Sequence, residues 1–165
     1  MSNDKFSKAH SNMCLYFNRE LTQFYRNFSQ KNGVQDMLCQ GYPITYAMVS
    51  QVLQDACPLD DFFRQFAEMQ NVMKIFAIAV NPDHRRKDIA ESLLYQSITV
   101  AQHKFYNAVV MTASNFDTIK LCRKLEMLDF KTAFWKDYKD PFGEKWFPKF
   151  LDEFKAEGYY KILFG

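Results

Sequence analysis

The sequence predicts an α/β fold, because two apolar segments of strand length lie on either side of a segment with helical periodicity. The first, residues 75–80, reads Ile-Phe-Ala-Ile-Ala-Val and ends at the turn signal Asn81-Pro82-Asp83. The second, residues 108–113, reads Ala-Val-Val-Met-Thr-Ala. Parallel strands need a crossover connection, and the region between these segments is long enough for one helix. The sequence therefore predicts a βαβ unit within a sheet flanked by helices.

Length and composition indicate a single globular domain spanning residues 1–165. Hydrophobic residues make up 48% of the chain and charged residues 24%, which is typical of a folded protein with a core. The net charge of +2 is too small to indicate a nucleic-acid partner. No apolar run reaches the ~20 residues of a membrane span, and residues 1–10 lack the apolar core of a signal peptide. We therefore expect a cytoplasmic protein without a membrane partner.

The cysteines indicate neither a disulfide framework nor a metal site. They form no C-x-x-C pair, and none has metal-ligand spacing to a histidine. We expect reduced thiols and no zinc. The residues concerned are Cys14, Cys39, Cys57 and Cys122, with His10, His84 and His103.

The N-terminal part predicts a disordered start followed by a helix with an aromatic face. Residues 1–12 are polar, and we expect them to be disordered. From Leu15 to Phe28 apolar residues recur at helical spacing, and Asn32-Gly33 is a typical helix stop. The apolar residues are Leu15, Tyr16, Phe17, Leu21, Phe24, Tyr25 and Phe28.

A hairpin and a second helix are predicted next. The apolar segments Val34–Cys39 and Ile44–Val52 are separated by Gln-Gly-Tyr-Pro, which indicates two strands with a turn at Gly41. Asp60 or Asp61 is expected to cap the helix that follows. The apolar residues of that helix are Phe62, Phe63, Phe66, Ala67 and Met69.

The predicted crossover helix begins in a cationic loop that contains His84, Arg85, Arg86 and Lys87. The first backbone N–H groups of a helix have no intrahelical partner, so cations beside them make a good site for anions, especially phosphates. The alternative interpretation is an ordinary helix start whose cationic side chains are solvated and bind nothing, since it would have the same residues. From Lys87 onward one stripe recurs at spacings of three and four and predicts the buried helix face. It comprises Ala90, Leu93, Leu94, Ser97, Ala101 and Phe105.

The C-terminal part predicts a third helix and two more strands. Ser114 or Asn115 can cap a helix that ends near Glu126-Met127. Alternating apolar and polar residues predict strands at 130–135 and 159–164, around a turn at 140–143. The residues of the helix expected to face inward are Ile119, Leu121, Cys122 and Leu125.

The loop resembles the acetyl-CoA site of the GNAT superfamily of N-acyltransferases. Val80, Pro82, Arg85 and Ala90 match its strand end, its V-x-P-x-x-R turn and its R/Q-x-x-G-x-G/A helix start. A second match lies at 135–144, which resembles the Y-x-D-Y-x-D-x-x-G segment of the arylalkylamine (dopamine-type) N-acetyltransferase branch. The resemblance implies a central twisted mixed β-sheet flanked by helices, with acetyl-CoA held where the central parallel strands separate.

The resemblance also implies the contacts and the reaction. The main chain of Ile78 and Val80 would pair with the pantetheine arm, and N–H groups from Arg86 to Ala90 would hold the pyrophosphate. A small arylalkyl or aliphatic amine would attack the thioester directly, with a backbone N–H near Val80 stabilising the oxyanion. Monomer and homodimer both stay open. The cofactor-binding residues implied are Ile78, Ala79, Val80, Arg85, Arg86, Lys87, Asp88, Ile89, Ala90 and Asn115.

Asp88 stands where the family has its first glycine. Glycine lets the backbone approach the pyrophosphate, whereas aspartate adds a side chain and a negative charge. Asp88 is therefore either an ordinary stabiliser of the helix dipole or a lesion in the cofactor site.

Two residues are candidates for acid–base catalysis. Glu20 lies in a segment that loosely resembles an early acidic motif of the arylalkylamine branch, where a glutamate is proposed as general base; an exposed helical glutamate is the other reading. Cys122 occupies the place of the proposed general acid, a tyrosine, and a packed core thiol is the other reading. The chain is therefore either an amine N-acetyltransferase or a degenerate, non-catalytic member that acts as a regulatory or interaction module.

Overall fold

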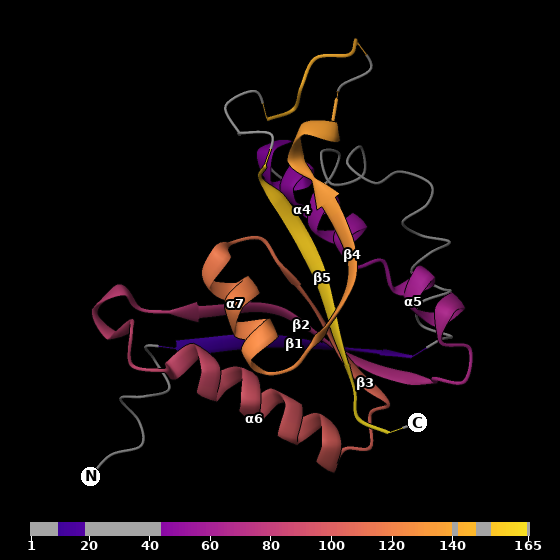
Figure 1. Cartoon of the computed structure of the whole chain (residues 1–165), viewed down its shortest axis with the longest axis vertical. Helices are drawn as coiled ribbons and strands as arrows, with labels where there is room; N and C mark the ends of the chain where they lie inside the picture. Colours follow the sequence, from indigo (N-terminus) through magenta and orange to yellow (C-terminus); the bar gives the residue numbers. More distant parts are fainter. Residues whose placement is uncertain (1–9, 19–43, 140–141, 148–152, 165) are drawn as a thin grey trace.

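The computed structural model describes residues 10–18, 44–139, 142–147 and 153–164. Within these residues five strands form one mixed sheet in the order β1-β2-β3-β5-β4 (Figure 1). The strands are β1 (His10–Asn18), β2 (Asn71–Val80), β3 (Ala108–Ala113), β4 (Leu128–Phe134) and β5 (Lys155–Ile162). The helices are α4 (Ile44–Ala56), α5 (Leu59–Gln65), α6 (Ile89–His103) and α7 (Phe116–Lys124), with 3-10 helices η1 (Pro82–His84) and η2 (Trp135–Asp137). The predicted mixed sheet flanked by helices is confirmed.

The predicted βαβ unit is present as β2, α6 and β3. The two strands pair in parallel, and α6 is the crossover between them. Strand β3 has the predicted bounds, and β2 ends at Val80 as predicted. It begins at Asn71, before the predicted start at 75, because Val72 and Met73 pair with Ala108 and Val109.

Helices cover both faces of the sheet. On one face, α6 and α7 pack on the odd-numbered residues of β2 and β3, such as Met73 and Val109. On the other, α5 packs on even-numbered residues such as Val72 and Val110, and α4 packs beside it on β4 and β5. Alternate residues of a strand point to opposite faces, so both faces of the central strands are buried. None of the described helices is long and apolar enough to span a membrane.

Helices α6 and α7 confirm most of the predicted buried faces. In α6, Leu94, Ser97 and Ala101 are buried, whereas Phe105 lies beyond the helix end and is 78% exposed. In α7 the side chain of Asn115 accepts a 2.9 Å hydrogen bond from the Thr118 N–H, so Asn115 rather than Ser114 is the cap. Ending at Lys124, α7 places Cys122 in the core.

The prediction for the N-terminal segment was wrong within its described part. Residues 10–18 form β1, so 10–12 are not disordered and Leu15 to Asn18 are not helical. The backbone of β1 pairs antiparallel with β2 from Asn18 opposite Asn71 to His10 opposite Val80. This non-local pairing fixes an extended conformation although the apolar spacing also fits a helix. The remainder of the predicted helix, residues 19–28, lies outside the described residues.

The predicted strand at 44–52 was also wrong, because this segment belongs to helix α4. Val49, Val52, Leu53 and Ala56 lie three or four residues apart or adjacent on one helix face, which packs against Trp135 and its neighbours. An apolar segment of this length fits either a strand or a buried helix. The other half of the predicted hairpin, Val34–Cys39 with Gly41, lies outside the described residues.

Helix α5 is shorter than predicted and is not capped by an aspartate. Its N-cap is Pro58, and Asp60 and Asp61 lie in the first turn, where they complement the helix dipole. Because α5 ends at Gln65, Met69 is buried beyond the helix and not on it.

The two C-terminal strands are present and pair antiparallel, with boundaries shifted from those predicted. Strand β5 lies between β3 and β4 (Figure 1). The chain therefore forms the edge strand β4 first and then returns to place β5 beside β3. In the connection, Gly143 has φ 88°, which glycine tolerates best. Residues 140–141 of the predicted turn lie outside the described residues.

Candidate functional site

The parallel strands β2 and β3 separate within the sheet. Val72 to Ile75 pair with Ala108 to Met111, and no later residue of β2 has a partner on β3 among the described residues. From there β3 pairs with β5 alone, at Thr112 and Ala113, while β2 continues to Val80 paired with β1. The sheet therefore opens after Ile75, and the β3-facing edge of the second half of β2 has no partner strand among the described residues.

A β-bulge marks the same point. Ala77 is opposite Met13 and Ile75 is opposite Cys14, so Phe76 is an extra residue on β2. Bulges bend a strand and re-aim its backbone and side chains, and they are frequent beside active sites. Phe76 is 47% exposed, unusual for a phenylalanine on an inner strand. The opening and the bulge together make β2 irregular at Phe76, before Ile78 and Val80, where the resemblance implies the contacts to the pantetheine arm and the oxyanion.

A small pocket lies on the α4 face of this opening. Its volume is about 140 Å³, and residues of α4, β2 and β3 line it. The hydroxyl of Thr112 donates a 3.0 Å hydrogen bond to the Leu53 carbonyl oxygen, which fixes α4 beside β3 at the pocket wall. The lining residues are Ser50, Leu53, Gln54, Lys74, Ile75, Phe76 and Thr112.

Lys74 brings an amine to the pocket. Its Nζ donates a hydrogen bond of 3.3 Å to the carbonyl oxygen of Cys57, which directly follows α4. Burial lowers the pKa of Lys74, and the neighbouring Cys57 thiol opposes this shift. Burial likewise raises the pKa of the Cys57 thiol. Both shifts favour the uncharged forms of the two groups.

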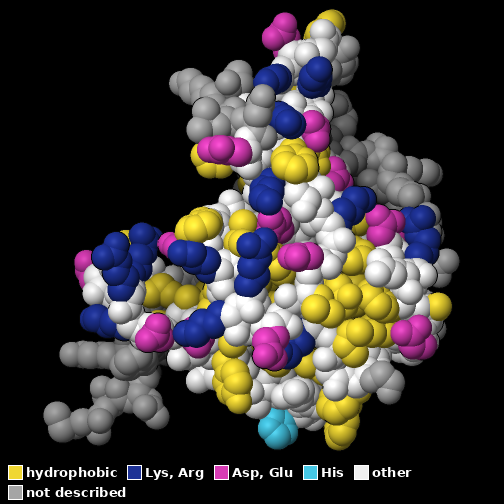
Figure 2. All heavy atoms as spheres, in the orientation of Figure 1, with side chains coloured by type: hydrophobic (Ala, Val, Ile, Leu, Met, Phe, Trp, Pro, Cys, Tyr) yellow, Lys and Arg dark blue, Asp and Glu magenta, His cyan; other side chains and the backbone are white. Residues whose placement is uncertain are grey.

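Local hydrogen bonds hold the loop from β2 to α6. Asn81 Oδ1 accepts a 3.0 Å hydrogen bond from the Asp83 N–H, and Arg85 Nε donates to the Val80 carbonyl oxygen at 3.5 Å. Arg86 has φ 59°, in the left-handed region. Residues 81–88 are exposed, and Figure 2 shows Lys and Arg side chains gathered over this loop on the left of the molecule. The loop therefore presents positive charge beside the first turn of α6.

Asp88 adopts a backbone conformation that favours glycine. It is the N-cap of α6 with φ 55°, and its side chain makes no capping hydrogen bond. Glu126, which directly follows the C-cap residue of α7, also has a left-handed backbone, with φ 56°. The left-handed backbone at Asp88 accounts for the glycine of the resembled motif, since glycine pays no Cβ penalty there.

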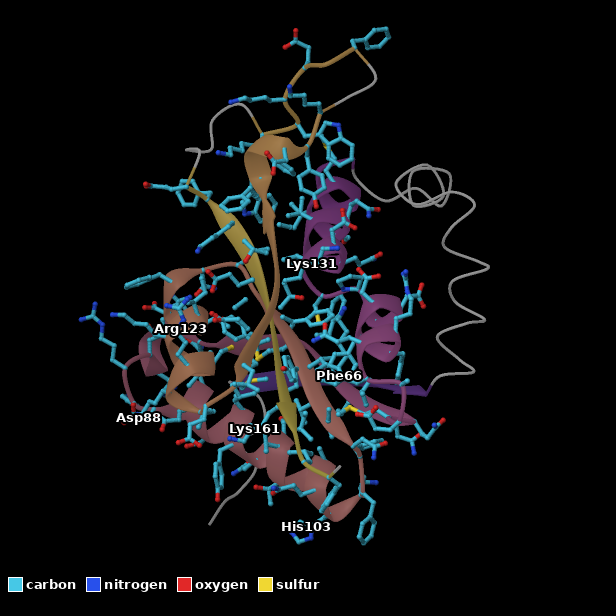
Figure 3. The ribbon with its side chains drawn as sticks, turned by 45° about the vertical axis from the view of Figure 1, so that its right-hand side comes forward. Phe66, Asp88, His103, Arg123, Lys131 and Lys161 are labelled. Atoms are coloured by element: carbon cyan, nitrogen blue, oxygen red, sulfur yellow. The ribbon has the colours of Figure 1, made fainter. Side chains whose placement is uncertain are left out.

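The depression beside Asp88 is open and mixed in charge. Its volume is about 350 Å³, and the first two turns of α6 and the end of α7 line it. Lys124 Nζ forms an ion pair of 2.5 Å with Glu91 across it. In Figure 3, Asp88 lies at the start of α6 with Arg123 above it on α7. The carboxylates of Asp88 and Glu91 thus offset part of the positive charge of the loop.

The predicted cofactor-binding residues fall into one continuous surface and one separate position. Ile78, Ala79 and Val80 end β2, the cationic residues follow in the loop, and Ile89 and Ala90 open α6. Asn115 caps the N-terminal end of α7, and the other end of that helix contacts α6. The two ends lie about 13 Å apart along the helix axis. Among the described residues no group of three or more His, Cys, Asp and Glu side chains is arranged to hold a metal ion.

The two predicted catalytic residues have different outcomes. Glu20 lies outside the described residues. Cys122 is fully buried, and its thiol donates to Met111 Sδ at 3.5 Å. Burial raises the pKa of Cys122 to about 12. An acid role for Cys122 stays a prediction, and the packing role is the one this position favours.

Sequence reasoning missed Lys74 and a buried carboxylate, Glu157. Lys74 directly precedes the apolar run at 75–80 and therefore lies outside the predicted strand. The signal that points to it in the sequence is a charged residue with apolar residues on both sides. Glu157 lies on β5 opposite Ala113 and accepts bonds from Arg123, Lys155 and Tyr159. Lys155 and Tyr159 lie two residues before and after Glu157 on the same face of β5, whereas Arg123 comes from α7, and no local pattern brings that third partner to the other two.

Comparison with known proteins supports the same family. The model of the acetyltransferase (GNAT) family matches residues 16–127, which include β2, its loop, α6, β3 and α7. No curated protein matches the sequence significantly.

Solved structures of insect enzymes have the same fold. A polyamine N-acetyltransferase from Drosophila melanogaster, which forms N-acetylagmatine, superposes with a TM-score of 0.72 at 12% identity over 94% of this chain and 69% of its own. A mosquito arylalkylamine N-acetyltransferase-like 5b gives 0.67 at 16% identity over 94% and 68%. Arylalkylamine N-acetyltransferase 2 from Aedes aegypti gives 0.62 at 15% identity, with the same coverage of 94% and 68%. At these identities the likeness shows the fold, and with the family match it leads to one conclusion: the chain belongs to the GNAT family of acetyltransferases.

Proposed function

We propose that this protein transfers the acetyl group of acetyl-CoA to the nitrogen of a small primary amine by direct attack. The observation that carries the proposal is the opening between β2 and β3 after Ile75, which runs from the cationic loop at one end to the pocket at Lys74 and Phe76. A single ligand with a phosphorylated end and a thioester end fits such a path.

The residues of the loop fit acetyl-CoA in all but one respect. N–H groups at the start of α6 and the side chains of Arg85, Arg86 and Lys87 suit a pyrophosphate. The β3-facing edge of β2 from Phe76 to Val80 suits an amide-containing arm, because a strand edge without a partner offers backbone hydrogen bonds. The Asp88 carboxylate is the exception, since it places negative charge at the anion site.

The pocket suits a small amine with an apolar part. At about 140 Å³ it is close in size to a cavity of about 150 Å³ that holds benzene. Leu53, Ile75 and Phe76 supply apolar walls, and Ser50 and Gln54 supply polar ones. The neighbours named above act on polyamine, agmatine or arylalkylamine, which supports an amine as the acceptor class.

The chemistry asks little of the protein beyond positioning. Acetyl-CoA supplies an acetyl thioester whose carbonyl carbon accepts the amine nitrogen. Holding both reactants in the opening supplies up to roughly 7–11 kcal/mol of the barrier reduction in well-oriented cases. Backbone N–H groups of the bulged part of β2 are suited to stabilise the developing oxyanion.

A specific observation favours a second candidate function, a GNAT-fold module that does not catalyse. Asp88 replaces the motif glycine at a left-handed position beside the anion site. If its carboxylate repels the pyrophosphate more than the three loop cations attract it, the fold persists without its chemistry.

Calorimetric titration of acetyl-CoA separates the two candidates. The enzyme hypothesis predicts micromolar binding that weakens about tenfold or more in Arg85→Ala, because one loop cation is lost. Lys104→Ala is the matched control, since Lys104 is an exposed cation at the far end of α6, and it should bind as the wild type does. Absence of binding at millimolar acetyl-CoA would favour the non-catalytic module and direct the search to protein partners.

A further inference from the structure

Among the described residues that line the pocket at the opening of the sheet, one can serve as the proton acceptor that the proposed reaction needs. We infer that Lys74 is the general base of this site and that its neutral amine takes a proton from the ammonium group of the acceptor. The inference rests on the proposed function, and it names the residue that prepares the acceptor for attack.

Lys74 is the titratable residue of the pocket wall. The other described lining residues are aliphatic, aromatic, hydroxyl or amide side chains, and the Thr112 hydroxyl already donates to the Leu53 carbonyl. Neither Ser50 nor Gln54 accepts a proton at ordinary pH. A primary amine is protonated at neutral pH and has no lone pair for attack, so a proton acceptor in the pocket removes a real barrier.

The position of the Lys74 amine suits this role. One of its N–H bonds points to the carbonyl oxygen of Cys57 at 3.3 Å, which holds the amine at the wall formed by the end of α4. A neutral amine that donates one N–H bond retains its lone pair for the pocket. Lys74 and Phe76 both line the pocket, so the amine is close to the bulge where the strands separate.

The surroundings of Lys74 favour the neutral amine before an acceptor binds. Burial lowers the pKa of Lys74, and the titratable group that acts on it among the described residues is the Cys57 thiol. That thiol is itself kept protonated, because burial raises its own pKa. On the neighbouring strand β3, Val110 lies opposite Lys74 and carries no charge. A desolvated lysine of this kind is a recognised way of making a general base.

The proton and electron balance closes without another reactant. The acceptor ammonium gives one proton to the Lys74 amine, which becomes an ammonium, and the acceptor becomes a neutral amine. Its nitrogen lone pair then forms the C–N bond, the C–S bond of the thioester breaks, and the electron pair leaves with the CoA sulfur. The second nitrogen proton passes to that sulfur to give the thiol, and Lys74 returns its proton to water.

The test compares Lys74→Met and Lys74→Arg with the wild type in steady-state kinetics. Met preserves the approximate shape of the side chain, and Arg preserves a cation that cannot deprotonate. With phenethylamine, which is an ammonium at neutral pH, both variants should lose about 100-fold or more in kcat, with the acetyl-CoA KM unchanged. With 2,2,2-trifluoroethylamine, which is already a neutral amine at that pH, both should stay within a few-fold of the wild type.

Two controls make the comparison decisive. Lys104→Met replaces an exposed lysine far from the pocket and should match the wild type with both amines. Thermal melting and calorimetric acetyl-CoA binding of each variant confirm that fold and cofactor site are intact. Because two different replacements are tested, failure of one variant to fold leaves the other to decide.

The outcomes are distinct for the two proposals. Loss with phenethylamine and retention with trifluoroethylamine supports the base. Full activity of Lys74→Arg or Lys74→Met with phenethylamine overturns the role of Lys74 as base and leaves the proposed function standing. An equal loss with both amines has the same meaning, because it indicates that Lys74 contributes to the shape of the pocket and not to proton transfer. A wild-type protein that binds acetyl-CoA but turns over neither amine nor agmatine overturns both.

Discussion

The hydroxyl group of Tyr138 donates a hydrogen bond of 2.7 Å to Oδ2 of Asp55 and so joins the segment after η2 to helix α4. Gln51 Nε2 donates to the other oxygen of the same carboxylate at 2.9 Å. Burial, and then the hydrogen bond to Asp55 and its charge, raise the pKa of Tyr138. Because α4 forms one wall of the pocket, this bond also holds the pocket wall against the C-terminal part of the sheet.

Tyr138→Phe should destabilise the protein by about 1–2 kcal/mol, since it removes a hydrogen bond to a charged, partly buried partner. Denaturant unfolding at neutral pH measures the loss as a shift in midpoint at constant slope. Tyr95→Phe is the control, because the Tyr95 side chain is 62% exposed on α6. An equal effect of the two substitutions would mean that the bond to Asp55 contributes nothing to stability.

Glu157→Gln should destabilise the protein by about 1–3 kcal/mol at neutral pH, because it removes the charge that three partners share. The carboxylate is 5% exposed, with Lys155 Nζ at 2.5 Å, Arg123 Nη2 at 3.3 Å and the Tyr159 hydroxyl as hydrogen-bond donors. Arg123→Gln is the matched variant: Arg123 is exposed and gives the weaker contact, so its loss should be the smaller one. Equal losses would place the stabilisation in the Arg123 pair alone.

The pH dependence of stability should differ between wild type and Glu157→Gln. Burial acts to raise the pKa of Glu157, but hydrogen bonds from Lys155 and Tyr159 and the charges of Lys155 and Arg123 outweigh it and lower the pKa below its ordinary value of 4.5. A carboxylate with a depressed folded-state pKa stabilises the fold fully above the unfolded-state value, and this stabilisation is lost as pH falls through the folded-state value. The stability difference between the two proteins should therefore be constant near neutrality and shrink below about pH 4.5. A constant difference down to the acid transition would contradict this assignment.

Gly158→Ala should destabilise the protein by about 1–3 kcal/mol or more through overpacking. A Cβ at this position of β5 would overlap the carbonyl oxygen of Ala56 and press on Cys57, so the end of α4 must move away from the sheet. The same movement displaces the carbonyl that holds Lys74, and amine turnover should fall together with the melting temperature. Gly143→Ala is the comparison, because nothing lies within 4 Å of its Cβ and only its φ of 88° opposes the substitution. A Gly158→Ala protein as stable as the wild type would show that α4 is not packed this closely.

The parts of the fold that local patterns specify could be predicted, and the parts that depend on distant partners could not. The turn after Val80, the face of α6 and the Asn115 cap follow from spacing and capping chemistry within a few residues. Strand β1 and helix α4 did not follow, because their apolar residues fit either period and the choice is made by pairing with β2 and packing on Trp135.

The candidate site divides in the same way. The cationic loop is contiguous in sequence, so it was predictable as one feature. The pocket at Lys74 forms because α4 packs beside the place where β2 and β3 separate. A bulge in β2 lies at that place, and Gly158 allows the end of α4 to approach the sheet closely. The residues around Lys74 in the sequence do not indicate that α4 packs beside it.

Asp88→Gly should tighten acetyl-CoA binding by about tenfold or more if the loop is the cofactor site. The substitution removes a negative charge beside the anion and uncovers the N–H groups of the first turn of α6. It also relieves a left-handed backbone, which should raise stability by about 0.5–1 kcal/mol. Calorimetric titration measures the first effect, and denaturant unfolding measures the second.

Two further variants separate the causes of that gain. Glu126→Gly relieves the same left-handed backbone at φ 56°, at the far end of α7 from its cap, and should raise stability without changing acetyl-CoA affinity. Asp88→Asn removes the charge but keeps a side chain that tolerates this conformation, so it should recover the electrostatic part of the gain alone. Unchanged affinity in both Asp88 variants would mean that the carboxylate faces no anion, and the cationic loop would then have to be read as a solvated helix start.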